Sequence, residues 1–141
     1  MSTWSAPVRY AECDQQGVAF HGHYLTWADE AATALMADRG MPYAALTARD
    51  LDTFVVASAL TWSTPARWGE TVDVDGDVER LGRTSFTFAL TIRVGERVCC
   101  TVRTTYVLVD WAGHPAPLPE DVRQAWAPDA GVDGGADART A

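Results

Sequence analysis

Lysine is absent from this sequence of 141 residues, so all eleven of its basic residues are arginines. A chain without lysine cannot form a Schiff base with a carbonyl substrate, and it cannot supply the lysine of a P-loop phosphate site. The formal net charge of −8 disfavours nucleic acids and anionic membrane surfaces as ligands. We therefore expect neither a nucleic acid nor a membrane among its partners.

Cysteine is also scarce, since the chain has only three, Cys13, Cys99 and Cys100. Cys99 and Cys100 are adjacent in an expected strand, where neighbouring side chains point to opposite faces, so we do not expect them to pair. No C-x-x-C pair and no Cys/His cluster with zinc-ligand spacing occurs. The pattern predicts three reduced thiols in a reducing compartment, without a metal site or a cofactor.

Long apolar runs are missing as well. No uninterrupted stretch of about 18 apolar residues occurs, which excludes a membrane-spanning helix. Residues 1–7 lack the basic and apolar segments of a secretory signal, so we expect a cytoplasmic protein. The length suits one domain, which we place at residues 1–126. Residues 127–141 are mostly Gly, Ala and Asp and predict a disordered tail.

One long helix is predicted over residues 22–39, because apolar residues cover most of its circumference and leave only a narrow polar stripe. Such a helix must be covered on most sides. Its many alanines allow a neighbour to pack close to the backbone. Arg39 and Gly40 suit its C-terminal end. A shorter helical turn is expected over residues 43–48.

Four later segments alternate large apolar residues with small or polar ones, at residues 53–63, 71–81, 84–94 and 97–109. A period of two predicts strands. Gly82 and Gly95 fall at two of the joins, where tight antiparallel turns need them. Residues 7–11 are expected to add a short fifth strand at the start of the chain.

These elements predict an α+β fold, since the sheet is the only element large enough to bury the helix. A curved antiparallel sheet of about five strands wrapped round one long central helix is the hotdog fold. A second subunit would cover more of the helix.

Polar residues of catalytic type gather in one segment before the helix. They are Tyr10, Glu12, Cys13, Asp14, Gln15, Gln16, His21 and His23. The exposed N–H groups and the dipole at a helix N-terminus favour negative charge. An enzyme can use that point to hold the oxyanion of an acyl-transfer intermediate.

Residues 8–31, VRYAECDQQGVAFHGHYLTWADEA, resemble the 4-hydroxybenzoyl-CoA thioesterase family of hotdog proteins, and in particular its bacterial acyl-CoA thioesterase branch. The family pattern is a Tyr, three residues, an Asp, two residues, a Gly, and then an aromatic residue and a His before the helix. The matching residues are Tyr10, Asp14, Gly17, Phe20 and His21. The likeness continues through residues 65–72, PARWGETV, and covers nearly the whole domain.

The resemblance implies hydrolysis of an acyl thioester on coenzyme A or on an acyl carrier protein. Asp14 would attack the thioester carbonyl or activate a water that does. The backbone N–H groups of His21 and Gly22 would polarise the thioester oxygen, and the His21 and Tyr10 side chains would assist. Two departures concern the substrate class: His23 stands where the family usually has Asn, and Ala32 stands where Arg is common.

Each candidate also has a simpler interpretation. Asp14 can cap a turn, as Asp often does before a Gly-containing loop. His21 and His23 lie two apart, which on a helix separates their directions and disfavours a shared metal. Cys13 is a poor candidate nucleophile, because the neighbouring carboxylate of Asp14 disfavours its thiolate form. Tyr10 can be a packing residue.

We expect Phe20, Tyr24 and Trp62 to contact the substrate. We expect Arg80 and Arg83 to bind the phosphates of coenzyme A. Other aromatic candidates for an acyl pocket are Trp27, Trp68, Phe86 and Phe88, although plain core packing explains them equally well. Solvated strand ends would equally explain the arginines.

Three questions stay open from sequence. The fold also suits an acyl-thioester dehydratase or hydratase, or a non-catalytic acyl-CoA-binding protein. A homodimer or homotetramer is expected, with the strand at residues 53–63 contributing to the interface. The acyl group and its carrier are not specified.

Overall fold

The computed structural model describes residues 2–128, so residues 129–141 of the expected disordered tail lie outside the described range. The elements are β1 (Trp4–Pro7), the 3-10 turn η1 (Tyr10–Glu12), α1 (His23–Asp38), α2 (Tyr43–Thr47), β2 (Leu51–Trp62), β3 (Thr71–Leu81), β4 (Ser85–Val94), β5 (Arg97–Asp110) and α3 (Glu120–Trp126). No helix of the described chain combines the length and the apolarity needed to cross a membrane.

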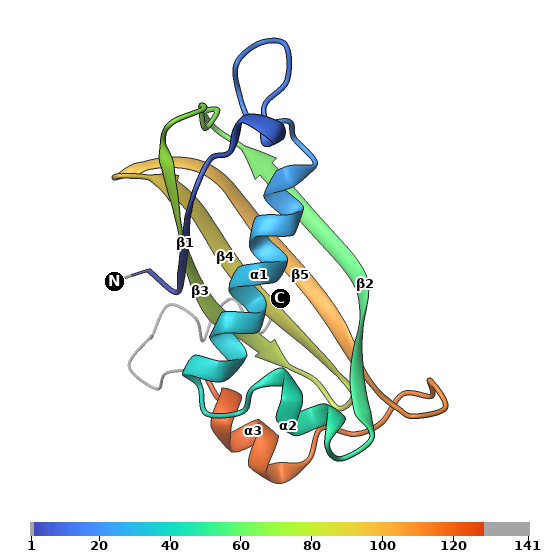
Figure 1. Ribbon diagram of the computed structural model, residues 1–141. Coiled ribbons are helices and arrows are strands. Elements are labelled where there is room, and N and C mark those ends of the chain that lie inside the picture. The colour runs from blue at the N-terminus through green and yellow to red at the C-terminus, as the bar shows by residue number, and fades with distance from the viewer. Residues whose placement is uncertain (1, 129–141) are drawn as a thin grey trace.

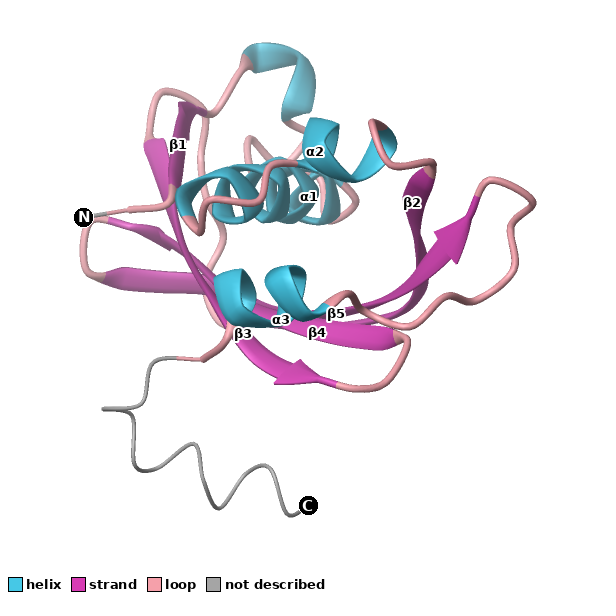
Figure 2. Ribbon diagram, turned by 90° about the horizontal axis from the view of Figure 1, so that it is seen from below, coloured by secondary structure: helices cyan, strands magenta, loops and turns pink. Residues whose placement is uncertain are grey.

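The five strands form one antiparallel sheet in the order β1-β3-β4-β5-β2 (Figure 1). Seen along the helix, the sheet curves round α1 (Figure 2), and α2 and α3 lie at the end where α1 finishes (Figure 1). The predicted α+β arrangement of about five strands round one long helix is confirmed.

Helix α1 is buried along one broad face in the single chain, whereas the sequence predicts a helix covered on most sides. Its buried residues are Tyr24, Trp27, Ala28, Ala31, Ala32, Leu35 and Met36. A close approach to β3 is possible because position 76 is glycine. A Cβ atom there would stand 2.9 Å from the Leu90 Cδ2 atom and 3.5 Å from the Leu35 Cδ2 atom. A side chain at position 76 would therefore displace Leu90, while Leu35 of α1 already lies at van der Waals distance.

The opposite end of the core is aromatic. Phe86 and Phe88 pack against Trp126 of α3, whose side chain is fully buried, and Tyr106 packs against both phenylalanines. The Trp126 indole N–H finds no acceptor among residues 2–128. The sequence interpretation did not identify α3, because seven residues after a proline-rich stretch carry too little periodicity to predict a helix.

The strand expected at residues 7–11 is wrong in position. The observed β1 ends at Pro7, and the chain then turns through η1. The cause is Glu12, whose carboxylate accepts a hydrogen bond from the Arg9 backbone N–H at 2.8 Å. A side chain that binds the backbone three residues earlier closes a turn and ends an extended strand.

Strand β2 is an edge of the sheet, paired only with β5. Its middle is apolar yet exposed: Phe54, Val55 and Val56 have exposed fractions of 51%, 56% and 58%. The pairing register shifts between Val55 and Ala57, which marks a β-bulge. The outer backbone groups of β2 therefore offer a template for another strand.

Candidate active site at the start of the central helix

The segment between η1 and α1 is a tight loop. The Asp14 N–H donates to the Val18 carbonyl at 2.9 Å, and the Gly17 N–H donates to the Asp14 carbonyl at 3.0 Å. Gly17 adopts a φ of +78°, a conformation that L side chains rarely adopt. A bridge between Cys13 and Ala19 closes the base of the loop. The loop thus has a defined shape and carries Asp14 on it.

Asp14 is half-buried, and its Oδ1 atom accepts a hydrogen bond from the Gln16 N–H at 2.8 Å. The simpler interpretation, in which Asp14 caps a turn, is therefore correct for this oxygen. Its Oδ2 atom accepts no hydrogen bond from residues 2–128. One oxygen orients the carboxylate while the other remains available to a water or a substrate.

The N-terminus of α1 lies beside this loop, and Gly22 is its N-cap residue, with no side-chain cap. The His23 N–H donates to the Phe20 carbonyl at 3.0 Å. The N–H groups of His21 and Gly22 have no acceptor within the described chain. Unpaired N–H groups at the positive end of a helix suit an oxyanion.

Aromatic rings surround the helix start. The His21 ring lies 4.2 Å from that of Phe20 and 6.2 Å from that of Trp62, measured between centroids. A cavity of about 210 Å³ opens here, lined by Ala19, His21, Tyr24, Trp62, Ser63, Thr64 and Pro65. The structure thus brings together the sequence candidates Phe20, His21, Tyr24 and Trp62.

Tyr24 joins the helix to the segment before β3. Its hydroxyl oxygen accepts a hydrogen bond from the Ala66 N–H at 2.9 Å, and the ring is 1% exposed. Burial raises the pKa of the Tyr24 hydroxyl above its ordinary value, although the hydrogen bond from Ala66 opposes this. Tyr24 therefore acts as a neutral structural link in the wall of the cavity.

Glu12 has a role that the sequence analysis did not assign. Its side chain is buried and accepts hydrogen bonds from the Arg9 side chain at 3.1 Å and from the Trp27 indole N–H at 3.0 Å. Burial alone would raise the pKa of Glu12, but the hydrogen bonds from Arg9 and Trp27 outweigh it and leave the pKa below its ordinary value. Glu12 ties the loop to α1. No sequence pattern predicts the contact between Glu12 and Trp27, which lie fifteen residues apart.

Tyr10 does not join this group. Its side chain is 78% exposed, and its ring contacts Trp68 at 5.8 Å between centroids. No hydrogen bond links its hydroxyl to Asp14 or His21 among the described residues. Its assistance in catalysis stays a prediction.

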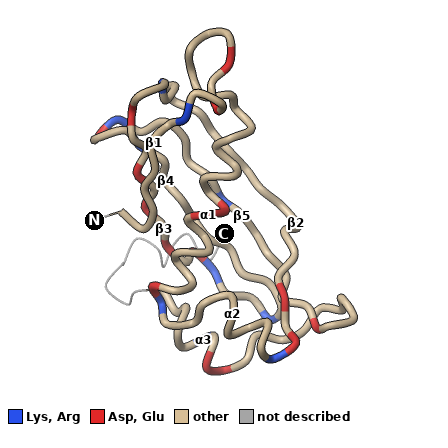
Figure 3. Tube along the Cα trace, viewed as in Figure 1, with Lys and Arg blue, Asp and Glu red and all other residues tan. Residues whose placement is uncertain are grey.

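Arg80 and Arg83 lie at the other end of the molecule. Arg80 is nine residues along β3 from Thr71, about 30 Å at the rise of a strand. It donates to the Ser85 Oγ atom at 3.2 Å. Figure 3 shows basic positions at both ends of the sheet. One chain therefore does not bring Arg80 and Arg83 near Asp14.

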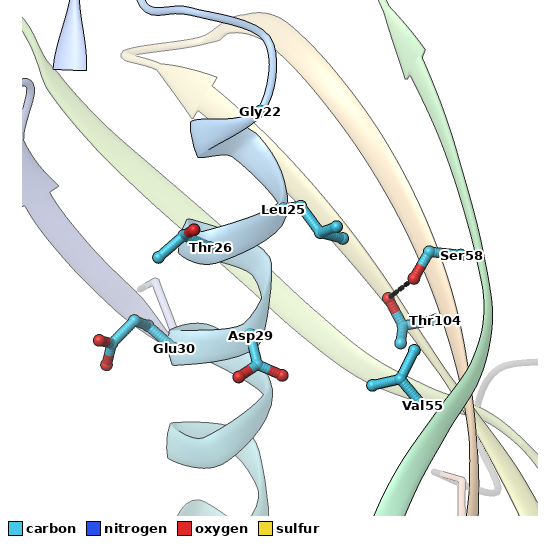
Figure 4. A pocket seen from close by; sticks show the side chains of 8 residues that line it. All are labelled: Gly22, Leu25, Thr26, Asp29, Glu30, Val55, Ser58 and Thr104. Carbon is cyan, nitrogen blue, oxygen red and sulfur yellow. Dashed lines mark hydrogen bonds between the residues drawn. The ribbon is translucent and has the colours of Figure 1, made fainter.

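A larger cavity, of about 430 Å³, separates α1 from β2. Figure 4 shows its lining residues: Gly22, Leu25, Thr26, Asp29, Glu30, Val55, Ser58 and Thr104. The hydroxyls of Ser58 and Thr104 lie 3.2 Å apart and share a hydrogen bond. Deeper along the helix, Asp29 and Val55 also line a second cavity of about 320 Å³, where the Tyr106 hydroxyl donates to the Asp29 Oδ1 atom at 3.3 Å. The cavities present apolar surface together with hydroxyl and carboxylate groups.

Residues 16–101 match the family model described as the thioesterase superfamily. The chain belongs to the thioesterase superfamily. Membership confirms the predicted family and hotdog fold, and it supports the predicted enzyme class, the thioester hydrolases.

Two relatives extend this comparison. A Bacillus subtilis (strain 168) protein named "Putative acyl-CoA thioesterase YneP" is 36% identical over 72 residues, which are 51% of this chain and 52% of that protein. The chain thus matches only about half the length of that relative. A "Putative esterase" of Aquifex aeolicus (strain VF5) is 23% identical over 115 residues, 82% of this chain and 89% of that protein.

Two solved structures overlay closely on this chain. A hypothetical protein from Thermus thermophilus has a TM-score of 0.83 at 29% identity, over 88% of this chain and 95% of its own. The 1,4-dihydroxy-2-naphthoyl-CoA thioesterase from Synechocystis has a TM-score of 0.78 at 19% identity, over 92% of this chain and 96% of its own. The second likeness shows the shared fold alone.

Proposed function

We propose that this protein hydrolyses acyl-CoA thioesters at the start of α1. The observation that carries the proposal is the pair of unpaired backbone N–H groups, those of His21 and Gly22, beside the loop that carries Asp14. Donors aimed at the thioester oxygen stabilise the negative charge that grows there during attack. The family membership and the relative named as an acyl-CoA thioesterase support the same reaction.

In this proposal Asp14 supplies the attack, with Gln16 holding one oxygen of its carboxylate. Either the free Oδ2 atom bonds to the carbonyl carbon and gives an anhydride that water then opens, or it takes a proton from an attacking water. In both routes the carbon–sulfur bond breaks, and the coenzyme A thiolate leaves and takes up a proton. His21, at the mouth of the cavity, is the proposed assisting group.

The acyl group is proposed to occupy the cavity between α1 and β2. Its length along the helix accepts an extended or ring-bearing group, and Ser58, Thr104 and Asp29 offer polar partners inside it. A purely apolar lining would be expected for a site that selects long alkyl chains.

We also propose that β2 pairs with β2 of a second copy, giving a homodimer or a homotetramer built from two dimers. An exposed, apolar edge strand of twelve residues supports this assembly, because a free edge of that kind otherwise invites uncontrolled pairing. The sheet of a second copy beside β2 would also cover the cavity between α1 and β2.

The test is thiol release from a panel of acyl-CoA thioesters, with free acid confirmed by chromatography. Asp14→Asn is expected to lose nearly all turnover, because the amide neither attacks nor accepts a proton. Asp38→Asn, which changes an exposed carboxylate at the C-terminal end of α1, is the matched control and should keep wild-type turnover. Equal turnover by Asp14→Asn would remove Asp14 from the mechanism. Binding of acyl-CoA without turnover would identify a binding protein instead.

A further inference from the structure

Two large aromatic side chains are exposed together next to the Asp14 loop. Tyr10 is 78% exposed and Trp68 is 64% exposed, and their rings meet edge to face at 5.8 Å between centroids with an interplanar angle of 74°. They come from distant segments, η1 and the turn before β3. Such a pair exposes the face of one ring and the edge of the other, an aromatic surface that the core does not use. We call it the Tyr10–Trp68 platform.

Positive charge borders the platform. Arg67 precedes Trp68 and is exposed, and its guanidinium forms no ion pair within the described chain. Arg9 precedes Tyr10, and its side chain is 73% exposed although it pairs with Glu12. The Arg67 guanidinium thus places a positive charge without a carboxylate partner among the described residues next to two exposed rings. An arginine beside exposed aromatic rings favours a planar ligand that carries negative charge.

We propose that the platform binds the adenine nucleotide of coenzyme A, with the base against Trp68 and Tyr10 and a phosphate on Arg67. This inference rests on the proposed function and assigns the carrier to coenzyme A. Bases stack on aromatic side chains whatever their sequence, and arginine pairs with phosphate in a fork geometry. An acyl carrier protein has no base for the rings, and it would need a broad basic face to meet its acidic surface.

The platform is joined directly to the proposed catalytic site. Val18 of the Asp14 loop forms a bridge with Arg67, and the Ala19 N–H donates to the Ala66 carbonyl at 2.8 Å. Ala66 in turn donates to the Tyr24 hydroxyl in the first turn of α1. Trp68 follows Ala66 by two residues, so their backbones lie within about 7 Å.

Pro65, at the start of the same segment, lines the cavity that contains His21. A ligand whose base lies on Trp68 therefore has its flexible arm beside the mouth of this cavity. The thioester at the end of the arm would then meet the start of α1.

The experiment measures nucleotide binding separately from catalysis. Adenosine 3′,5′-bisphosphate is titrated calorimetrically into the wild type, Trp68→Ala, Trp68→Phe and Arg67→Gln. Trp111→Ala is the matched control, since Trp111 is 84% exposed in the turn after β5. In parallel, KM and kcat are measured on one acyl group carried by coenzyme A and by pantetheine, which lacks the nucleotide.

Trp68→Ala is expected to bind the bisphosphate about tenfold more weakly, the loss that one base-stacking contact supplies. Its KM for acyl-CoA should rise by a similar factor with kcat nearly unchanged, and its KM for acyl-pantetheine should not move. Trp68→Phe should keep most of the binding, and Arg67→Gln should weaken it and reduce its salt dependence. Trp111→Ala should match the wild type.

Equal bisphosphate binding by Trp68→Ala and the wild type would overturn the inference. So would an equal rise of KM for both thioesters, or a rise for an acyl carrier protein substrate alone. Trp68-dependent binding of the bisphosphate by a protein that hydrolyses no thioester would uphold the inference and refute the proposed function, so the two fail separately.

Discussion

Replacing Glu12 with alanine should destabilise the protein by about 3 kcal/mol. The buried carboxylate accepts three hydrogen bonds, from the Arg9 N–H at 2.8 Å, the Arg9 Nη2 atom at 3.1 Å and the Trp27 Nε1 atom at 3.0 Å. The Trp27 side chain is 2% exposed, so its indole N–H would stay dry and unpaired, at a cost of about 2 kcal/mol. Losing the charge-assisted bond from the Arg9 backbone adds about 1 kcal/mol. The bond from the exposed Arg9 side chain adds little.

Urea unfolding at pH 7 measures this free energy, and thermal unfolding should show a fall of about 10 °C in Tm. Glu96→Ala, in the exposed turn between β4 and β5, is the matched control and should change the free energy of unfolding by less than about 0.5 kcal/mol. A loss for Glu12→Ala no larger than that of the control would refute the account of Glu12 as the tie between the loop and α1.

The same residue predicts a pH dependence. The pKa of Glu12 is lower in the folded chain than its ordinary value of 4.5, so the folded state favours the charged form. The stabilisation is therefore complete above the ordinary pKa and is lost as the pH falls through the folded value. Between pH 7 and pH 3 the wild type should lose more free energy of unfolding than Glu12→Gln does. An equal loss in both proteins would contradict the shifted pKa.

Three further changes test other parts of the structure. A thiol dye should react quickly with half-buried Cys13 but slowly with Cys100, since burial raises the pKa of the Cys100 thiol to about 11. Peptide mapping after brief labelling shows which cysteine reacts first. Gly76→Ala should lower the free energy of unfolding by about 1–3 kcal/mol, because the added methyl meets Leu90, and urea titration measures it. Val56→Glu places a charge on the exposed edge of β2 and should convert the proposed β2-paired assembly to single chains. Light scattering coupled to chromatography measures the mass of both proteins, and the same mass for the variant and the wild type would contradict pairing through β2.

The sequence was sufficient for the elements whose periodicity is long. The helix predicted over residues 22–39 is observed as His23–Asp38, and the four long strands are shifted by two residues or fewer at either end. The helix and the strands β3, β4 and β5 each bury apolar residues at regular spacing, so the pattern of apolar residues carries their positions. Strand β2 has no buried residue within the described chain, but its alternation of large and small residues carries the same signal. Short elements carry no such signal, which explains the misplaced first strand and the unrecognised α3.

The site was predictable only in part. The gathering of Phe20, His21, Tyr24 and Trp62 follows from the family pattern together with the fold. The contact between Glu12 and Trp27 and that between Tyr10 and Trp68 depend on how distant backbones approach each other. Residue spacing does not predict such contacts. The sequence analysis therefore gave Glu12 no specific role and considered Trp68 as a residue of the acyl pocket or the core.

The unpaired indole N–H of Trp126 has a consequence for local opening. The group loses its water on docking of α3 and gains no acceptor among the described residues, which costs about 1–3 kcal/mol. The docked state of α3 carries this cost, and the undocked state is relieved of it. The last helix is therefore less firmly held than its buried aromatic contacts suggest, and its amides should exchange with solvent through partial opening while the sheet stays intact.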